Sequence, residues 1–394
     1  MKFDFDEIVD RKNTNSLKYD FAAERGRPAD VLPLWVADMD LKAPPAVIDA
    51  LKQKAEHGIF GYSMPKSDYF ETVAKWFKER HGWVVNPDNF MTTPGVVFAI
   101  CTLLHTVTKP DDAVIICQPV YYPFANSIKD GGRTLVVSEL KLVNGRYEID
   151  FDDFERKIVE NRVKAFILCS PHNPVGRVWT KEELEKLGDI CLKHGVFVIA
   201  DEIHADFTFG GHRHIPFCTI KEEFESICAV CTAPSKTFNL AGLQISNVYF
   251  PDPEVKKKFC ARLDAVGYWE PNIMGLVACA AAYEKGGEWL DELKTYLDGN
   301  LKFVREYLAA NLPKIKLIEP EGTYLLWLDC RELNLSAEEL QNLVEQGAKL
   351  WLDDGYIFGA GGEGFERVNI ACPRATLDAA LSRLAAEIHR RKLQ

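Results

Sequence analysis

Basic runs, internal repeats and low-complexity segments are missing from this 394-residue sequence. The chain carries 47 Lys and Arg against 58 Asp and Glu, which gives a formal net charge of −11. Proteins that bind nucleic acid or anionic membrane surfaces need clustered positive charge. Neither is therefore expected as a partner of this chain.

A segment apolar enough to enter a membrane is also missing. The most apolar helical run, VVFAICTLLHTV (Val96 to Val107), is too short to span a bilayer. The N-terminus, MKFDFDEIVDRK, is acidic and lacks the apolar stretch of a signal peptide. With 47% apolar and 27% charged residues the composition is typical of a soluble globular enzyme, and a cytoplasmic location is expected.

Patterns for metals and disulfides lack their usual context. The eleven cysteines are scattered, and several lie in apolar strand-like runs, where they are expected to act as small buried hydrophobes in a reducing compartment. Cys228 and Cys231 have C-x-x-C spacing, but on a strand they would point to opposite faces. His212 and His214 lack ligand partners at metal-site spacing and are expected in a solvated loop. No metal is predicted.

Short apolar strands alternate with longer amphipathic segments from about residue 90 to about residue 250. The expected strands are DAVIIC, RTLVVSEL, KAFILCS, VFVIADE, SICAVC and QISNVYF. Between two of them, KEELEKLGDICLKHG reads as a helix with Thr180 as its N-cap and Gly195 as its stop. The alternation predicts an α/β fold whose mostly parallel sheet is flanked by helices, with ligands beyond the carboxyl ends of the strands.

The pattern changes after about residue 285. Helical segments such as WLDELKTYLDGNLKFVREYLAANL and SAEELQNLVEQGAKL surround the short strands TYLLWLD and RVNIAC, and a final helix closes the chain. This is typical of a smaller α+β domain. We predict a large domain over residues 48–285 and a small domain made of residues 1–47 and 286–394.

Residues that could bind a ligand or take part in a reaction follow the expected strands, and one of them precedes the first strand. In chain order they are Gly95, Tyr121 and Tyr122, Asn173, Asp201, His204, and Lys236. Gly95 is expected at a helix N-terminus, where free N–H groups can hold a phosphate.

This set suits pyridoxal phosphate. That cofactor needs a lysine for its Schiff base and an acid beside its ring nitrogen, so that the ring can act as an electron sink. It also gains from an aromatic ring on its face. Lys236 and Asp201 are the candidates for the lysine and the acid.

Four motifs carry a family resemblance over nearly the whole chain. SPHNPVGRVW, ADEIHADF, PSKTFNLAGL and NIACPR resemble the signatures of class I/II PLP-dependent aminotransferase-like enzymes. PLWVADMD and the glutamine of AGLQ are similar to the cystathionine β-lyase, or C–S lyase, branch. The resemblance implies a PLP-dependent transferase-like fold and a homodimer.

The resemblance also implies a role for each matching residue. Lys236 would form the Schiff base and move the Cα proton, Asp201 would pair with the pyridinium nitrogen, and Tyr121 would stack on the ring. Asn173 would hydrogen-bond the ring oxygen, with His204 nearby. The phosphate would be held by Gly95, Val96, Val97, Ser235 and Thr232, and by Tyr62 from the neighbouring subunit. The substrate would contact Arg374, which grips its α-carboxylate, together with Asn173 and Ala37.

Single residues still have ordinary alternatives. Asp201 could be a helix N-cap, Tyr122 could replace Tyr121, and His204 could be a satisfied neighbour of the site. Gln244 stands where the wider family usually has a phosphate-binding arginine, which favours the lyase branch and leaves the phosphate ligands open. The formal G-x-G-x-x-G of GAGGEG (Gly359 to Gly364) precedes a strand rather than a helix, so it is interpreted as a turn near the substrate entrance.

The implied reaction is β-elimination on a cysteine S-conjugate, with L-cystathionine as the leading candidate, to give a thiol, pyruvate and ammonia. An aminotransferase of the same fold is the first rival, because it shares the residues that remove the Cα proton. The second rival is a protein that keeps the fold but binds a regulatory partner. Intact Lys236, Asp201 and Arg374 argue against a purely non-catalytic role.

Overall fold

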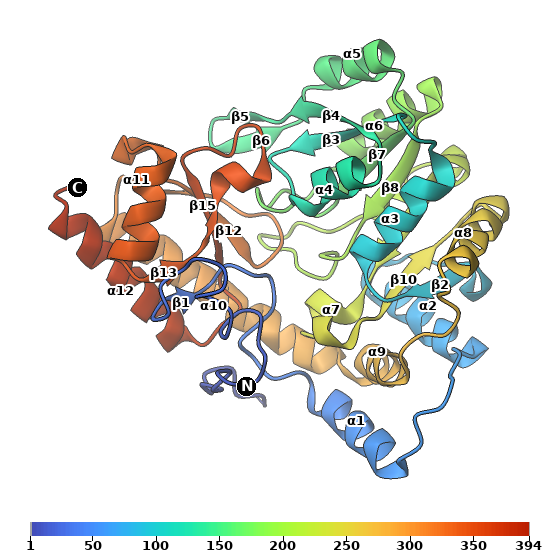
Figure 1. The fold of residues 1–394 in the computed structure, drawn as a ribbon, viewed down its shortest axis with the longest axis horizontal. Coiled ribbons are helices and arrows are strands. Elements are labelled where there is room, and N and C mark those ends of the chain that lie inside the picture. Colours follow the sequence, from blue (N-terminus) through green and yellow to red (C-terminus); the bar gives the residue numbers. More distant parts are fainter. Residues whose placement is uncertain (1, 394) are drawn as a thin grey trace.

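The computed structural model describes residues 2–393 (Figure 1). Its centre is a seven-stranded sheet in the order β2-β10-β9-β8-β7-β3-β4. In that order the strands are Phe90–Thr93, Ser246–Tyr249, Cys228–Thr232, Phe197–Asp201, Ala165–Cys169, Ala113–Gln118 and Thr134–Glu139. The β10 strand runs antiparallel to both of its neighbours, β2 and β9, and the other strands of this sheet share one direction. The predicted α/β class with a mostly parallel sheet is confirmed.

Both faces of this sheet are buried, because successive residues of each strand point to opposite sides. On one side Val114 and Ile116 of β3 pack with α3 (Val96–Val107) and α8 (Pro253–Ala265). On the other side Ile115 belongs to a core shared with α5 (Phe151–Asn161) and α6 (Lys181–His194). This double burial explains why the strands are apolar at nearly every position.

The α6 helix forms as its sequence predicts. The Thr180 hydroxyl accepts a hydrogen bond from the Glu183 amide, the Glu183 carboxylate accepts one from the Thr180 amide, and Gly195 ends the helix at φ 64°. This reciprocal capping satisfies two N–H groups that a helix end leaves free. The remaining helices near the large sheet are α1 (Pro45–His57), α2 (Ser67–His81), α4 (Pro123–Asp130), α7 (Pro234–Thr237) and α9 (Ile273–Lys285).

A second, antiparallel sheet lies at the C-terminal end of the chain. Its order is β11-β12-β15-β14, and its strands are Lys316–Ile318, Leu325–Asp329, Phe365–Asn369 and Asp353–Asp354. The α10 (Gly287–Asn311) and α12 (Arg374–Arg390) helices pack beside it, and α11 (Ala337–Asn342) continues into one π-helical turn, Leu343–Gly347. The segment from Ser336 was expected to be one α-helix, so this turn is a local departure.

The N-terminal segment joins the smaller sheet region. The β1 strand (Leu32–Pro33) pairs in parallel with β13 (Leu350–Trp351), and the Trp35 and Trp351 rings stack at 4.4 Å. A further hairpin, β5 (Lys141–Val143) with β6 (Arg146–Glu148), extends from the large sheet. Within residues 2–393 no helix is long and apolar enough to cross a membrane.

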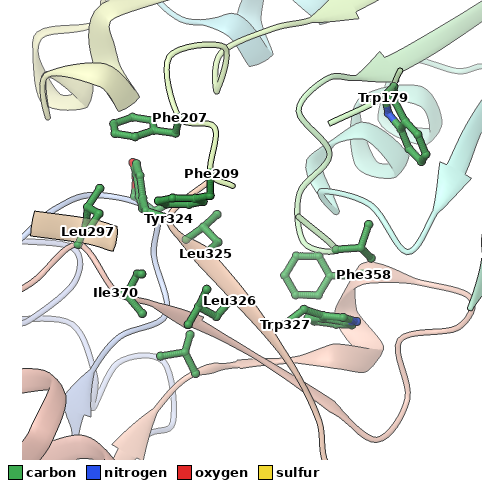
Figure 2. Close-up of a cluster of buried hydrophobic side chains, with 14 of the residues drawn as sticks. Trp179, Phe207, Phe209, Leu297, Tyr324, Leu325, Leu326, Trp327, Phe358 and Ile370 are labelled. Atoms are coloured by element: carbon green, nitrogen blue, oxygen red, sulfur yellow. The ribbon is translucent and has the colours of Figure 1, made fainter. Parts of the chain in front are cut away.

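Aromatic side chains fill the junction between the two sheets. Figure 2 shows Phe207 and Phe209, from the segment after β8, beside Tyr324, the residue that precedes β12. The Phe207 and Tyr324 rings meet edge to face at 4.9 Å, and Trp327 contacts Phe358 at 5.4 Å. This packing fixes the smaller sheet against the carboxyl ends of the large-sheet strands, where the candidate site lies.

Candidate active site

A cavity of about 420 Å³ opens at the carboxyl ends of the parallel strands. Its walls come from β7, β8, the turn after β9, the start of α3 and the loop before α1. Among the predicted site residues, those that line it are Ala37, Gly95, Val96, Val97, Tyr121, Asn173, Asp201, His204, Ser235 and Lys236. The carboxyl ends of parallel strands lie at one edge of a sheet, so residues that follow different strands meet there. Most of the predicted site residues therefore line one cavity.

Lys236 enters the cavity from α7, one short turn beyond β9. Its Nζ donates a hydrogen bond to the carbonyl of Ala37 at 2.8 Å, and the Tyr324 hydroxyl donates to the same oxygen at 3.0 Å. Loss of hydration inside the site lowers the pKa of Lys236 to about 8, against the opposing effect of Asp38. A lysine so placed is a far better base and nucleophile at neutral pH than an exposed one.

This lowered pKa gives a direct expectation for the cofactor-free protein. The Lys236 amine becomes neutral as pH rises through about 8, rather than near the ordinary value of 10.5. Its labelling rate by an amine-selective reagent, followed on the Lys236 peptide by mass spectrometry, should therefore reach half its maximum near pH 8. Exposed lysines in the same sample provide the internal reference. A half-maximum above pH 10 at Lys236 would contradict the desolvated site.

Asp201 ends β8, is buried, and lines the same cavity as Lys236. One carboxylate oxygen accepts the Ile203 amide at 3.1 Å. Burial outweighs this bond and the attraction of Lys236, and raises the pKa of Asp201 to about 7. Within residues 2–393 no cationic side chain forms an ion pair with Asp201. A cationic N–H group placed in the cavity would supply the missing partner.

His204 and Asn173 complete the same wall. Burial lowers the pKa of His204 well below its ordinary value, so its ring is neutral, and its Nδ1 is buried without a hydrogen-bond partner. The Asn173 side-chain oxygen accepts a bond from Arg367 at 3.1 Å, and its backbone carbonyl accepts the Tyr121 amide at 3.0 Å. These contacts fix Asn173 and Tyr121 relative to each other.

Tyr121, rather than Tyr122, faces the cavity. The two rings lie 5.5 Å apart, but Tyr122 turns toward Phe358, whose ring centre is 5.8 Å away. The sequence leaves this choice open, and the structure favours Tyr121 as the ring available for stacking.

The N-terminus of α3 forms the far end of the cavity. Gly95 is its N-cap, and the amides of the first helical residues have no acceptor within the helix. A Cβ placed on Gly95 would meet no protein atom within 4 Å. The open space and the free N–H groups suit a phosphate, and Ser235 lies on the same wall.

Thr232 is not part of that wall. Its hydroxyl donates to the Asn247 carbonyl at 3.0 Å within the sheet, and the residue is buried. Thr232 lies on β9 itself and precedes the turn that reaches the cavity. A phosphate contact from Thr232 therefore has no support in this structure and stays a prediction.

Arg374 also lies away from the cavity. Its Nε donates to the Asn300 side chain at 2.7 Å, and its guanidinium lies 4.8 Å from the centre of the Phe303 ring. The arginine that contacts a cavity-lining residue is Arg367 of β15, which donates to the Asn173 side-chain oxygen, to the Trp35 carbonyl at 2.6 Å and to the carboxylate of Asp353. The sequence did carry a signal for Arg367, because it is a charged residue within the strand-like run FERVNIAC. A cation buried in a strand needs polar partners, which a functional site can supply.

Of the two histidines expected in a solvated loop, only His214 departs from the expectation. His214 is buried rather than solvated, and its Nε2 bonds the Glu202 carboxylate at 2.8 Å. His212 stays exposed. Spacing along the chain cannot reveal that His214 pairs with Glu202, which directly follows β8.

Several other expectations can be placed. Cys228 and Cys231 belong to the two opposite cores of the sheet, as predicted. The GAGGEG segment forms a turn that precedes β15, also as predicted, and its Ala360 amide bonds the Gln118 side chain at 2.9 Å. Tyr62 is 96% exposed and contributes nothing to the cavity of its own chain.

The described residues fit pyridoxal phosphate at three separate points. A lysine of lowered pKa, a buried carboxyl without a cationic partner and a helix N-terminus with open space stand around one cavity. The orphaned Nδ1 of His204 adds a polar group that lacks a partner in the protein alone. An enzyme that binds pyridoxal phosphate is the class of protein that this fold and site define.

Comparison with known proteins supports that class. The family model for aminotransferase class I and II matches residues 29–384. Cystathionine beta-lyase PatB of Bacillus subtilis (strain 168) is 44% identical over 384 residues, covering 98% of this chain and 99% of that protein. The chain belongs to the aminotransferase class I and II family.

Two solved structures show the same architecture. Cystalysin from Treponema denticola, which contains a pyridoxal 5'-phosphate cofactor, is 39% identical with a TM-score of 0.95, covering 99% of this chain and 100% of that chain. The PLP-bound C-S lyase from Staphylococcus hominis is 32% identical with a TM-score of 0.92, covering 98% of each chain. The predicted PLP-dependent transferase-like fold is thereby confirmed.

Proposed function

We propose that this protein is a PLP-dependent carbon–sulfur β-lyase of the cystathionine β-lyase type. It cleaves L-cystathionine or a related cysteine S-conjugate to a thiol, pyruvate and ammonia. The observation that carries the proposal is the full-length similarity to cystathionine beta-lyase PatB, together with a cavity that both Lys236 and Asp201 line.

The proposed cofactor site uses the residues of the cavity wall. Lys236 carries the cofactor covalently, Asp201 pairs with its ring nitrogen, and Tyr121 stacks on its ring. Asn173 and His204 contact the ring substituents. The α3 N-terminus at Gly95, Val96 and Val97, together with Ser235, holds the phosphate. Bound pyridoxal phosphate supplies the electron sink that accepts the pair left when the Cα–H bond breaks.

The protein groups account for proton transfer and orientation. Neutral Lys236 accepts the Cα proton, and in the cofactor-free protein its amine donates a hydrogen bond to the carbonyl of Ala37. The Cβ–S bond then breaks, sulfur leaves with the bonding pair as the thiolate, and one water molecule enters as the remaining fragment becomes pyruvate and ammonia. Cystathionine, cysteine and larger S-conjugates all carry the carboxylate, amine and Cβ–S bond that these residues address.

Arg367 is proposed to bind the substrate carboxylate, in place of Arg374. Its guanidinium is held by Asn173, Trp35 and Asp353, so the planar donor fork is oriented in advance. Ala37 and Asn173 remain the other proposed substrate contacts, because both line the cavity.

A matched pair of variants tests this assignment. Arg367→Lys keeps the charge but loses the fork, and we expect KM for L-cystathionine to rise about 10- to 100-fold, the range for losing a charge-assisted hydrogen bond. Arg374→Lys makes the same change outside the cavity and should alter KM less than about twofold. Steady-state kinetics on both holoenzymes decides the matter. The reverse pattern would restore Arg374 to the site.

The proposed assembly is a homodimer in which Tyr62 reaches the partner's phosphate. The segment between α1 and α2 exposes Ile59, Phe60, Tyr62 and Met64, an apolar run that one chain alone leaves in solvent. Tyr62 shares a surface groove with Gln244, which also lines the cavity, so the segment lies near its phosphate end. Because Gln244 brings no positive charge, a hydroxyl from a second chain would strengthen phosphate binding.

Tyr62→Phe should therefore weaken retention of the cofactor about tenfold, by loss of one hydrogen bond to a charged group. The dissociation constant is measured by titrating cofactor-free protein with pyridoxal phosphate. Tyr307→Phe, which removes a hydroxyl that bonds Ser382 far from the groove, is the control. Unchanged affinity in Tyr62→Phe would refute the contact, and sedimentation of the wild-type protein tests the dimer itself.

A cytoplasmic location is part of the proposal. All eleven cysteines are free thiols, and most are buried, which suits a reducing compartment.

The decisive experiment separates elimination from transamination. Purified holoenzyme is incubated with L-cystathionine and no keto acid, and pyruvate is followed over time. Pyruvate released over many turnovers supports the lyase. If no pyruvate forms and amino-group exchange is seen only after a keto acid is added, the protein is an aminotransferase instead.

A further inference from the structure

A buried hydrogen-bonded chain lies directly behind Lys236. Thr237, the next residue, is buried, and its hydroxyl donates to one carboxylate oxygen of Asp206 at 2.7 Å. The other oxygen of Asp206 bonds Nε2 of His81 at 2.9 Å. His81 is the last residue of α2, so three separate elements meet at one carboxylate.

Asp206 is held as a carboxylate despite its burial. The bonds from His81 and Thr237 lower its pKa below the ordinary value, although burial alone would raise it. A buried carboxylate with two directed partners fixes their positions, because loss of either partner leaves charge uncompensated.

Asp206 is connected to both Asp201 and Lys236, to the first through the chain and to the second through Thr237. It lies five positions after Asp201, in the segment that also carries His204. Its partner Thr237 belongs to α7, the four-residue helix that carries Lys236. A single helical turn is not stable by itself, so the position of α7 depends on its contacts with the surrounding residues.

We propose that Asp206 is a positioning residue that, through Thr237 and with support from His81, sets the place of Lys236 relative to Asp201. This inference rests on the proposed function, because Lys236 and Asp201 address opposite parts of the bound cofactor. Misplacement of one of them by about an ångström can cost about a hundredfold in rate.

The competing explanation is hydrophobic anchoring by Phe238. Its ring packs edge to face on Trp76 at 5.4 Å and beside Trp289 at 6.0 Å. If this packing alone places α7, the Thr237 hydroxyl contributes stability but no control over Lys236. The two explanations predict different results for the same small substitutions.

Thr237→Val and Thr237→Ser form the test pair. Valine keeps the shape of threonine without its hydroxyl, whereas serine keeps the hydroxyl. For the valine variant we expect a roughly tenfold weaker affinity of the cofactor-free protein for pyridoxal phosphate and a roughly tenfold lower kcat, with KM for L-cystathionine within about twofold. Serine should restore both quantities to within about threefold of wild type.

A second pair approaches the same carboxylate from the other side. His81→Leu removes the donor to Asp206 and should produce the same weakened cofactor affinity, while His81→Gln, which can still donate, should keep most of it. Combined with Thr237→Val, the His81→Leu effect should be smaller than in the wild-type background, because both act through Asp206. This pair also decides the question if Thr237→Val fails to fold.

The results divide cleanly. Wild-type affinity and kcat in Thr237→Val and His81→Leu, with only a lower melting temperature, would overturn the positioning role and leave the lyase proposal intact. A wild-type protein that neither binds pyridoxal phosphate nor releases pyruvate would overturn the proposed function, and the positioning role with it.

Discussion

Replacing Lys236 with alanine should abolish pyruvate formation from L-cystathionine, with a loss of about 10³-fold or more in kcat. The lysine is proposed to serve both as the covalent attachment point and as the base for the Cα proton, and loss of a positioned base alone typically costs about 10²- to 10⁴-fold. No other lysine lines the described cavity, so no neighbouring amine can replace it.

The measurement is steady-state pyruvate release with saturating pyridoxal phosphate. Lys257→Ala, which removes an exposed lysine of α8, is the matched control and should keep wild-type activity. Circular dichroism and thermal melting establish that Lys236→Ala is folded. A folded Lys236→Ala enzyme with activity within tenfold of wild type would contradict the assigned role.

Replacing Asp201 with asparagine should separate activity from stability. Asparagine has nearly the same shape but cannot carry the negative charge that favours a protonated ring nitrogen, so we expect kcat to fall about 10²-fold or more. Pyridoxal phosphate should still bind, although more weakly. The measurement is kcat for holoenzyme, with the dissociation constant of the cofactor measured in parallel.

The same substitution should make the cofactor-free protein more stable above neutral pH. Burial raises the pKa of Asp201 to about 7 from an ordinary value of 3.8, so the folded state holds a proton that the unfolded state releases. The associated stability is present below about pH 4 and is lost as pH rises toward 7. Asparagine has no charge to bury, so Asp201→Asn should exceed wild type in unfolding free energy at pH 8 by about 2–4 kcal/mol.

Urea unfolding of both cofactor-free proteins at pH 5 and pH 8 tests this expectation. The difference between variant and wild type should grow with pH. A constant difference would mean that Asp201 does not titrate within this range, and a less stable variant at pH 8 would mean that its carboxylate is compensated by a group in the protein.

The general location of this site can be predicted from the sequence, because ligands bind beyond the carboxyl ends of the strands in a parallel sheet. Asp201 and Lys236 each follow a run of apolar residues, and parallel strands end at one edge. Once β8 and β9 are recognised, their following residues must lie near one another. The two ends of α6 can also be predicted from the sequence, because Thr180 and Gly195 are capping residues whose effect is local.

The predicted site residues that do not line the cavity are ones whose role depends on the direction of the side chain rather than on order along the chain. Thr232 differs from Ser235 by three positions, but its side chain points into the sheet toward Asn247. Arg374 and Arg367 lie on either side of NIACP, and only the backbone pairing of β15 with β12 and β14 shows which of them faces Asn173. Such choices depend on register, which a single sequence does not specify.

Buried polar partners are the other feature that sequence reasoning could not supply. His214 bonds Glu202, and His81 bonds Asp206, across separations of 12 and 125 residues. Neither pair has a recognisable spacing, because the contacts are made by the packing of α2 and the segment after β8. These pairs lie immediately behind Asp201 and Lys236, where they can hold the reactive groups in place.

The most direct test of this account is to locate the cofactor on the chain. Holoenzyme is reduced with borohydride, which fixes a lysine–pyridoxal bond, then digested and mapped by mass spectrometry. The account predicts one pyridoxyl-modified peptide, carrying the modification at Lys236. A modification at any other lysine, or none in a protein that turns over L-cystathionine, would contradict it.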